Sequence, residues 1–266
     1  MEREEAPAVE EFEILRRRQT GISPARDVVA REEPLEVRLN GRTLVYLMRL
    51  PGDEVPLAVG FLVSEGIIQE RGQIELVHHC KDGPGNLVEI KARLASGADR
   101  FGEARVVRTG CGGADLGREV DLDAVRVESE TRFPASVIAS VPDLLLERQE
   151  VFTSTGGTHG AGIFDDRGRV LVVKEDVGRH NAVDKALGFM LLSGERTGDK
   201  GLVLSGRLSY EMVLKAARAG LPLICSVSAP TSLGVEVGVR TGVTMVGFLR
   251  GGNFNIYSHP ERVGGD

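Results

Sequence analysis

Polar and small residues follow four apolar segments in the second half of the chain, and those segments have the composition of buried strands. The runs are Lys174-Glu175-Asp176-Val177-Gly178-Arg179-His180-Asn181, Ser205-Gly206-Arg207, Ser228-Ala229-Pro230-Thr231 and Arg250-Gly251-Gly252-Asn253. In open α/β sheets, ligands bind beyond the carboxyl ends of the strands, where the N–H groups of the following helices point outward. Arg179, Arg207 and Arg250 supply planar donors that suit phosphate. The four runs together predict a site for a phosphorylated ligand.

Each run taken alone is also compatible with an ordinary helix cap or turn. The two commonest nucleotide-binding motifs, G-x-x-x-x-G-K-[ST] and a G-x-G-x-x-G after a strand, do not occur in the sequence. Glu175 and Asp176 could accept hydrogen bonds from a base or sugar, or they could pair with Arg179 or Lys174. These alternatives remain open from the sequence.

Cys111 lies in the glycine-rich segment Arg108-Thr109-Gly110-Cys111-Gly112-Gly113-Ala114. Such a segment predicts an exposed, flexible loop, which is where a reactive thiol would be placed. Arg105 and Arg108 could lower the pKa of the thiol and so raise the thiolate fraction. A nucleophile and an unreactive loop cysteine are both compatible with this local sequence.

The other candidate residues carry weaker signals. Cys225 lies in an apolar segment and is predicted to be a core residue, whereas Cys80 beside His78 and His79 lacks the further ligands of a structural zinc site. His159 could be a general base, a donor to the ligand or a histidine that holds a turn. The sequence His259-Pro260-Glu261 matches the H-x-E of metal-dependent deaminases, but no P-C-x-x-C follows it. We therefore expect no tightly bound metal.

The elements that would position these residues alternate along the second half. Residues 162–164 and 170–173 are predicted to be paired strands, and the spacing Ser140-x-x-Asp143 predicts a helix start before residues 144–150. Predicted helices at 180–192, 209–219 and 231–240 alternate with predicted strands at 202–204, 221–227 and 243–249. This alternation, with strands apolar on both faces, predicts an α/β domain with a largely parallel sheet.

The first half has a different pattern. Residues 1–31 are rich in charge and poor in apolar residues, which predicts a mobile or loosely attached arm. Asn40-Gly41 between two alternating segments predicts a β-hairpin, residues 54–65 a helix closed by Gly66, and residues 74–78 and 87–94 two more strands. The predicted organisation is an arm at 1–31, a small α+β domain at 32–108 and an α/β domain at 109–266, with a flexible cysteine loop at 109–118.

Composition narrows the class of protein. The chain of 266 residues has a net charge of −6 and no long basic run, so broad nucleic-acid binding is not expected. Its cysteines are too few and scattered for a disulfide scaffold, and no apolar stretch is long enough to span a membrane. These features predict a soluble cytoplasmic protein that contacts neither nucleic acid nor membrane.

Several motifs in order resemble the FdhD family of formate dehydrogenase accessory proteins. They are Glu33-Pro34-Leu35, Leu57 to Leu62 followed by Ser64-Glu65-Gly66, Thr155-Gly156-Gly157-Thr158-His159, EDVGRHNAVDK from Glu175 to Lys185, Ser205-Gly206-Arg207-Leu208-Ser209, and Ser228 to Leu233. The resemblance runs from about residue 32 to about residue 263. It implies a cytidine-deaminase-like three-layer α/β core without the deaminase zinc, and a chain that usually pairs as a homodimer.

The same resemblance implies a function. Members would be sulfurtransferases that receive persulfide sulfur from a cysteine desulfurase and pass it to the molybdenum cofactor, in its bis-molybdopterin guanine dinucleotide form, for formate dehydrogenase. Guanosine diphosphate would mimic part of that ligand. The persulfide cysteine maps to Cys111, and the cofactor-binding segment maps to Phe248, Leu249, Arg250, Gly251, Gly252 and Asn253. From the strand-end runs we add Arg207, Ser228, Thr231, His180 and Asn181 as candidate ligand-binding residues.

One departure from the family pattern bears on mechanism. Members commonly carry C-x-x-C in the loop, whereas position 114 of this chain is alanine. Resolution through a second loop thiol is therefore excluded, although a relay needs only one thiolate. A cofactor-binding chaperone that moves no sulfur remains an alternative, as does a hydrolase that uses Cys111 with His159.

Overall fold

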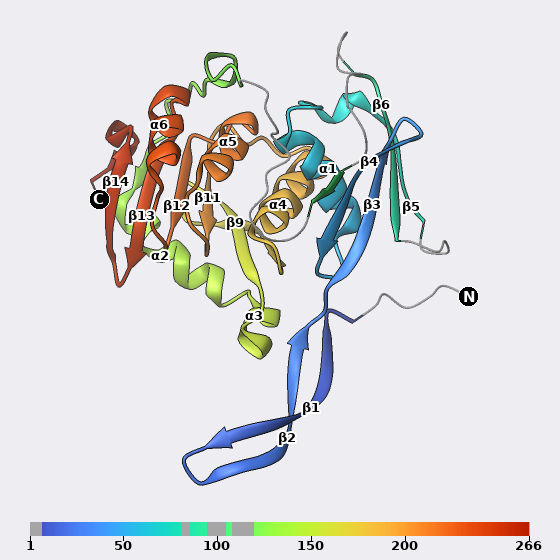
Figure 1. The fold of residues 1–266 in the computed structure, drawn as a ribbon. Coiled ribbons are helices and arrows are strands. Elements are labelled where there is room, and N and C mark those ends of the chain that lie inside the picture. Colours follow the sequence, from blue (N-terminus) through green and yellow to red (C-terminus); the bar gives the residue numbers. More distant parts are fainter. Residues whose placement is uncertain (1–6, 81–85, 95–104, 108–119, 266) are drawn as a thin grey trace.

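Two α/β units lie side by side, and a long β-hairpin extends away from them (Figure 1). The computed structural model describes residues 7–80, 86–94, 105–107 and 120–265. Arg108, Cys111, Ala114, the predicted cysteine loop at 109–118 and the predicted boundary at 108–109 lie outside the described residues.

The first unit is a five-stranded sheet covered by one helix. Its elements are β3 (Glu33–Leu39), β4 (Arg42–Arg49), α1 (Glu54–Ser64), a 3₁₀ turn (Arg71–Gln73), β5 (Ile74–Cys80), β6 (Leu87–Ala92) and β7 (Arg105–Val107), and the strand order is β5-β6-β3-β4-β7. Asn40 (φ 51°) and Gly41 (φ 80°) both adopt the left-handed conformation that a two-residue hairpin turn requires. The predicted hairpin, helix and additional strands are all present.

The second unit has three layers around a six-stranded sheet of order β10-β9-β11-β12-β13-β14. Helix α2 packs on one face of the sheet, and α4, α5 and α6 cover the other (Figure 1). Its elements are β8 (Phe133–Pro134), α2 (Ala135–Leu146), α3 (Glu150–Thr155), β9 (His159–Asp165), β10 (Val170–Asp176), α4 (Arg179–Ser193), β11 (Lys200–Leu204), α5 (Tyr210–Arg218), β12 (Leu223–Ser226), α6 (Ser232–Thr241), β13 (Thr244–Arg250), β14 (Asn253–Ser258) and β15 (Val263–Gly264), with 3₁₀ turns at Asp123–Val125 and Pro260–Arg262.

The sheet is mixed, so the prediction of a largely parallel sheet is wrong. Only the β11–β12 and β12–β13 pairs are parallel, whereas β10–β9, β9–β11 and β13–β14 are antiparallel. The sequence predicted the β9–β10 hairpin but not β14, which returns along β13 through the turn at Gly251-Gly252. The mixed α/β class is confirmed.

The helix start predicted at Ser140 is also wrong. Helix α2 begins at Ala135 and contains both Ser140 and Pro142, and the Ser140 hydroxyl donates to the carbonyl of Val137 (2.9 Å) instead of capping a helix. Pro134 pairs in the short strand β8 and so fixes the extended backbone that precedes the helix. The residues after α2 form a separate short helix, α3, which the sequence did not predict.

The two units are joined by the close packing of α1 against α4. A Cβ atom placed on Gly60 would lie 1.7 Å from the carbonyl oxygen of Asp184, and one on Gly188 would lie 1.8 Å from that of Pro56. The helix backbones are therefore in direct contact, which only glycine permits at these two positions.

Residues 9–30 form a hairpin of β1 (Val9–Arg18) and β2 (Gly21–Ala30). The sequence predicted an arm there but no regular structure within it. The base of β2 touches α3, while most of the hairpin projects beyond both units (Figure 1). In the described part of the chain, no helix is long and apolar enough to cross a membrane.

Candidate functional site

A cavity of about 620 Å³ opens at the edge of the six-stranded sheet where the predicted strand ends meet. Its volume falls within the range of ligand-binding pockets. It is lined by Ala139, Pro142, Asp143, Leu145, Leu146, Gln149, Phe152, Gly156, Gly157, Thr158, His159, Val177, Ser205, Val227, Leu249, Arg250 and Gly251. Three predicted site residues, Leu249, Arg250 and Gly251, are among them.

The strand register explains why residues distant in sequence meet at this edge. His159 at the start of β9 lies opposite Asp176 at the end of antiparallel β10, and Ala161 lies opposite Leu204 at the end of β11. Strands β12 and β13 run parallel to β11 and therefore end at the same edge. The sequence-based prediction that these ends converge is confirmed by the sheet topology.

His159 and Ser205 form one wall of the cavity. The Ser205 hydroxyl accepts from the backbone N–H of Gly160 (3.0 Å) and lies 3.3 Å from His159 Nδ1. Burial, reinforced by the positive charge of Arg179, lowers the pKa of His159 below its usual 6.5. The imidazole is thus neutral at physiological pH and can donate or accept a hydrogen bond.

Gln149 contributes an amide that the sequence analysis missed. The residue is 3% exposed, and its Nε2 has no hydrogen-bond partner within the described residues. The Gln149 side chain packs against the backbone of Gly160, which has no Cβ. A Cβ added to Gly160 would lie 2.5 Å from Gln149 Cδ. A buried donor without a partner is costly unless a ligand or water satisfies it. No motif in the sequence marks this residue.

Glu175 shapes the opposite wall instead of meeting a ligand. Its carboxylate accepts from the backbone N–H groups of Val151 (3.0 Å) and Phe152 (2.7 Å) and from the hydroxyl of Thr158 (2.7 Å). A carboxylate at the start of α3 satisfies N–H groups that have no partner within the helix. Glu175 therefore holds α3 and the Gly156-Gly157 turn in place, and pairs with neither Arg179 nor Lys174.

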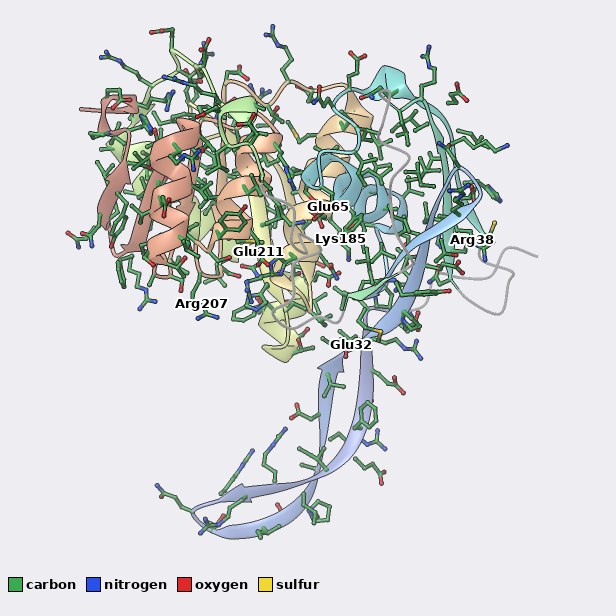
Figure 2. The ribbon with its side chains drawn as sticks, turned by 45° about the horizontal axis from the view of Figure 1, so that its top comes forward. Glu32, Arg38, Glu65, Lys185, Arg207 and Glu211 are labelled. Carbon is green, nitrogen blue, oxygen red and sulfur yellow. The ribbon has the colours of Figure 1, made fainter. Side chains whose placement is uncertain are left out.

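Arg250 is the arginine that lines the cavity. It is exposed at the end of β13, and its Nε donates to the carbonyl of Val227 (2.8 Å), which holds the guanidinium beside the mouth. Arg207 is also exposed but does not line the cavity, and Figure 2 shows it at the molecular surface. The sequence predicted both as phosphate clamps, whereas the geometry favours Arg250.

The predicted segment 248–253 is the end of a β-hairpin. Gly251 (φ 55°) and Gly252 (φ 77°) form its two-residue turn, and Arg250 pairs with Asn253 across it. Phe248 is 45% exposed with φ 54°, and Gly252 and Asn253 lie on the turn, outside the cavity lining. The turn alone accounts for glycine at positions 251 and 252, which is one of the two alternatives compatible with the sequence.

The remaining predicted residues have local partners. His180 Nε2 lies 2.8 Å from Glu211 Oε2, Thr231 caps α6 by accepting from Gly234 N (3.2 Å), and the Ser228 carbonyl accepts from Phe248 N (3.0 Å). Asn181 Nδ2 donates to Met48 O (2.7 Å) and to Asp176 Oδ1 (3.0 Å). None of these residues lines the cavity.

The motif EDVGRHNAVDK mainly joins the two units. Asp176 is fully buried and forms an ion pair with Lys185 (2.8 Å), while Leu50 N donates to the same carboxylate (3.1 Å). Lys185 Nζ in turn donates to the carbonyl of Leu50 (2.9 Å), and Figure 2 shows this lysine in the interior. The end of β4 is therefore fixed to the start of α4, next to His159.

The other cysteines have no role in this site. Cys225 is fully buried in β12, and burial raises the pKa of its thiol, as expected of a core residue. Cys80 is half-buried on β5. Among the described residues, no three His, Cys, Asp or Glu side chains are grouped so that they could hold a metal ion.

Comparison with known proteins establishes the family. Residues 30–264 match the model of the FdhD/NarQ family, so the chain belongs to this α/β family. It is 40% identical over 271 residues to a sulfur carrier protein FdhD of Streptomyces avermitilis, covering 96% of this chain and 95% of the relative. It is 39% identical over 259 residues to a protein of the same description from Saccharolobus solfataricus, covering 96% and 98%.

A solved structure agrees with the fold. The crystal structure of a provisionally assigned formate dehydrogenase accessory protein from Desulfotalea psychrophila superposes with a TM-score of 0.79 at 29% identity, covering 97% of this chain and all of the other. The family resemblance read from the motifs is therefore confirmed.

Proposed function

We propose that this protein is a sulfur carrier that takes persulfide sulfur from a cysteine desulfurase onto Cys111 and passes it to the bis-molybdopterin guanine dinucleotide cofactor for formate dehydrogenase. Relatives that match nearly the whole chain are described as sulfur carriers. The structural observation that carries the proposal is the cavity at the sheet edge, which combines Arg250, a neutral imidazole and an amide donor that has no partner among the described residues.

The cavity has groups suited to one end of a guanine nucleotide. Arg250 can hold a phosphate, while the Asp143 carboxylate can accept from the N–H groups of guanine and the Gln149 amide can donate to its carbonyl oxygen. Leu145, Leu146 and Phe152 provide apolar surface for a ring. His180, Asn181, Ser228 and Thr231 have local partners, and Arg207 does not line the cavity, so we propose no direct ligand contact for these residues.

The position of β7 supports a role for Cys111 at this cavity. Val107 pairs with Leu47 on parallel β4, and three residues further along the chain Leu50, just after β4, donates its N–H to Asp176, which lies opposite His159. Cys111 is four positions beyond Val107, and an extended chain of that length spans at most about 14 Å. Strand β7 itself therefore runs, parallel to β4, toward the sheet edge where His159 lines the cavity.

The relay needs only one thiolate in this protein. The Cys111 thiolate attacks the terminal sulfur of the desulfurase persulfide, the new S–S bond forms as the old one breaks, and the desulfurase cysteine leaves as a thiolate. In the second step the S–S bond on Cys111 would break, the terminal sulfur would pass to the cofactor, and Cys111 would leave as a thiolate; the two electrons that reduce this sulfur to sulfide would come from the acceptor. Neither step uses a second protein thiol, so Ala114 in place of a second cysteine does not prevent the reaction.

Several finer features belong to the same proposal. We propose a cytidine-deaminase-like core, because the second unit has helices on both faces of a mixed sheet, and no resident zinc. We also propose cytoplasmic location and pairing of two chains into a homodimer. The alternative function is a cofactor-binding chaperone that moves no sulfur, and Ala114 is the observation in its favour.

Nucleotide binding tests the cavity assignment. We expect guanosine diphosphate to bind and Arg250→Ala to weaken binding by roughly tenfold to a hundredfold, because losing a charge-assisted contact costs about 1.5 to 3 kcal/mol. Arg207→Ala is the matched control, since it removes another exposed arginine that does not line the cavity. Titration calorimetry would contradict the assignment if both variants retained the wild-type affinity or if Arg207→Ala alone lost it.

A further inference from the structure

The hairpin of β1 and β2 cannot be explained by its contacts within the chain. An isolated two-stranded sheet is marginally stable in water, yet both strands here are ten residues long. Leu15 is 73% exposed, Ile22 66% and Phe12 46%, although such side chains usually gain stability from burial. A surface of this kind indicates a binding partner.

The two free edges of the hairpin differ in their capacity to pair. Pro24 lies in the middle of β2 and lacks the N–H needed to extend a ladder, so it protects that edge. Strand β1 contains neither proline nor glycine, and within the described residues it pairs only with β2. The edge of β1 is therefore open for another strand.

Charge is divided along β1 in a way that suits pairing with itself. Glu10, Glu11 and Glu13 lie in the half nearest the body, and Arg16, Arg17 and Arg18 lie toward the tip. Arg17 and Arg18 face Ile22 and Gly21 across the hairpin, so β2 provides no acidic group opposite them. Placing two β1 strands antiparallel about a two-fold axis brings the acidic half of each against the basic half of the other.

We propose that a second copy of this chain pairs along β1, forming a four-stranded antiparallel sheet from two hairpins with Ile14 at the two-fold axis. In this register Glu10 faces Arg18 and Glu11 faces Arg17, and symmetry repeats each pair. The proposal names the interface of the homodimer in the proposed function and is independent of sulfur transfer.

The alternation of backbone groups restricts the possible registers. Along β1, every second residue points its N–H and C=O groups toward the free edge. Two residues that lie opposite each other in an antiparallel pair must both point these groups toward the partner strand or both away from it. The two-fold axis must therefore pass through a residue and not between two residues. A two-fold axis at Glu13 would place that carboxylate opposite its own copy. An axis at Leu15 would leave a single kind of opposite-charge pair, Glu13 with Arg17. Ile14 is therefore the favoured centre.

Charge exchange tests this interface in the full-length chain by sedimentation. The double variant Arg17→Glu, Arg18→Glu places Glu against Glu, and the double variant Glu10→Arg, Glu11→Arg places Arg against Arg. Each should weaken its own dimer at least tenfold, because favourable cross-strand pairs become repulsive ones. An equal mixture of the two should form a heterodimer, and a chain with all four changes should recover most of the dimer.

A cross-link measures the register directly. Two Ile14→Cys chains would bring paired Cα atoms to about 4.5 to 5.5 Å, within disulfide reach, so mild oxidation should join them. In Leu15→Cys chains the two introduced cysteines are offset by two residues and should not form a disulfide. The wild-type chain shows whether the native cysteines alone give a cross-link under the same oxidation.

The outcomes separate the possibilities. A dimer that is unaffected by both double variants would overturn this interface while leaving a homodimer through another surface. A wild-type chain that stays monomeric at all concentrations would overturn both the interface and the proposed homodimer. If the double variants lose binding to a different protein, and the chain with all four changes does not regain that binding, the hairpin would be assigned to that other partner.

Discussion

The contact between α1 and α4 makes a strong prediction about stability. Gly60→Ala would place a methyl carbon 1.7 Å from the carbonyl oxygen of Asp184, whereas ordinary contact begins at 3.4 Å. The clash is with the backbone of a buried helix, so a side-chain rotation cannot relieve it. The two helices would have to separate by a distance comparable to the missing 1.7 Å.

The expected destabilisation lies at the upper end of overpacking effects, about 3 kcal/mol. Alanine favours a helix over glycine by up to about 1 kcal/mol, which offsets only part of that cost. For a chain of this size, 1 kcal/mol corresponds to about 2 to 4 °C in Tm. We therefore expect Gly60→Ala to lower the Tm by roughly 4 to 12 °C.

Thermal unfolding followed by circular dichroism measures this effect. Gly72→Ala is the matched control, because an added Cβ there meets no atom within 4 Å and the backbone is not in the left-handed region. A Tm of Gly60→Ala within about 1 °C of the control would refute the argument that the two units are joined by direct backbone contact.

Three further predictions concern titratable side chains beside the cavity and between the two units. The folded state lowers the pKa of His159 below 6.5, so the contribution of this residue to the free energy of unfolding is present above that pH and is lost as the pH falls. His159→Gln should therefore make the free energy of unfolding less dependent on pH in that acidic range. An unchanged pH dependence would contradict burial of the imidazole as the cause. Lys185→Met leaves the buried Asp176 carboxylate without its ion pair and should cost about 3 to 5 kcal/mol in urea unfolding, whereas a loss under about 1 kcal/mol would show that the pair does not join the units. Glu175→Gln should weaken guanosine diphosphate binding by displacing α3, while Glu147→Gln, a change of an exposed carboxylate on the adjacent helix end, should not; equal affinities measured by calorimetry would remove Glu175 as a support of the cavity wall.

Local signals in the sequence were sufficient to predict most elements. Asn40-Gly41 specified a turn in which both residues adopt positive φ, and Gly66 follows α1 in the left-handed conformation. The strand ends also converge as expected, because β11, β12 and β13 run parallel and β10 reaches the same direction through two antiparallel pairings. These features depend on a few consecutive residues or on a general rule of sheet geometry.

The missed features depend on contacts between distant segments. Gln149 becomes part of the cavity only because Gly160, on another element, leaves room for its side chain. Asp176 was a candidate ligand-binding group, but the end of β4 supplies a partner that no local pattern reveals. Ser140 has the spacing of a helix start, yet the helix had already begun after Pro134. Contacts between segments that are far apart in the sequence determine each of these three features.

Mass measurement of the intact chain tests most directly whether Cys111 carries sulfur. After incubation with a cysteine desulfurase and free cysteine, we expect the protein to gain the mass of one sulfur atom, located on the peptide that contains Cys111 and released by a thiol reductant. Cys111→Ser should gain none while binding guanosine diphosphate as the wild type does, because a hydroxyl cannot carry a persulfide. Cys225→Ser should still gain one sulfur. A wild-type chain that gains no sulfur, or a Cys111→Ser chain that still does, would contradict the relay.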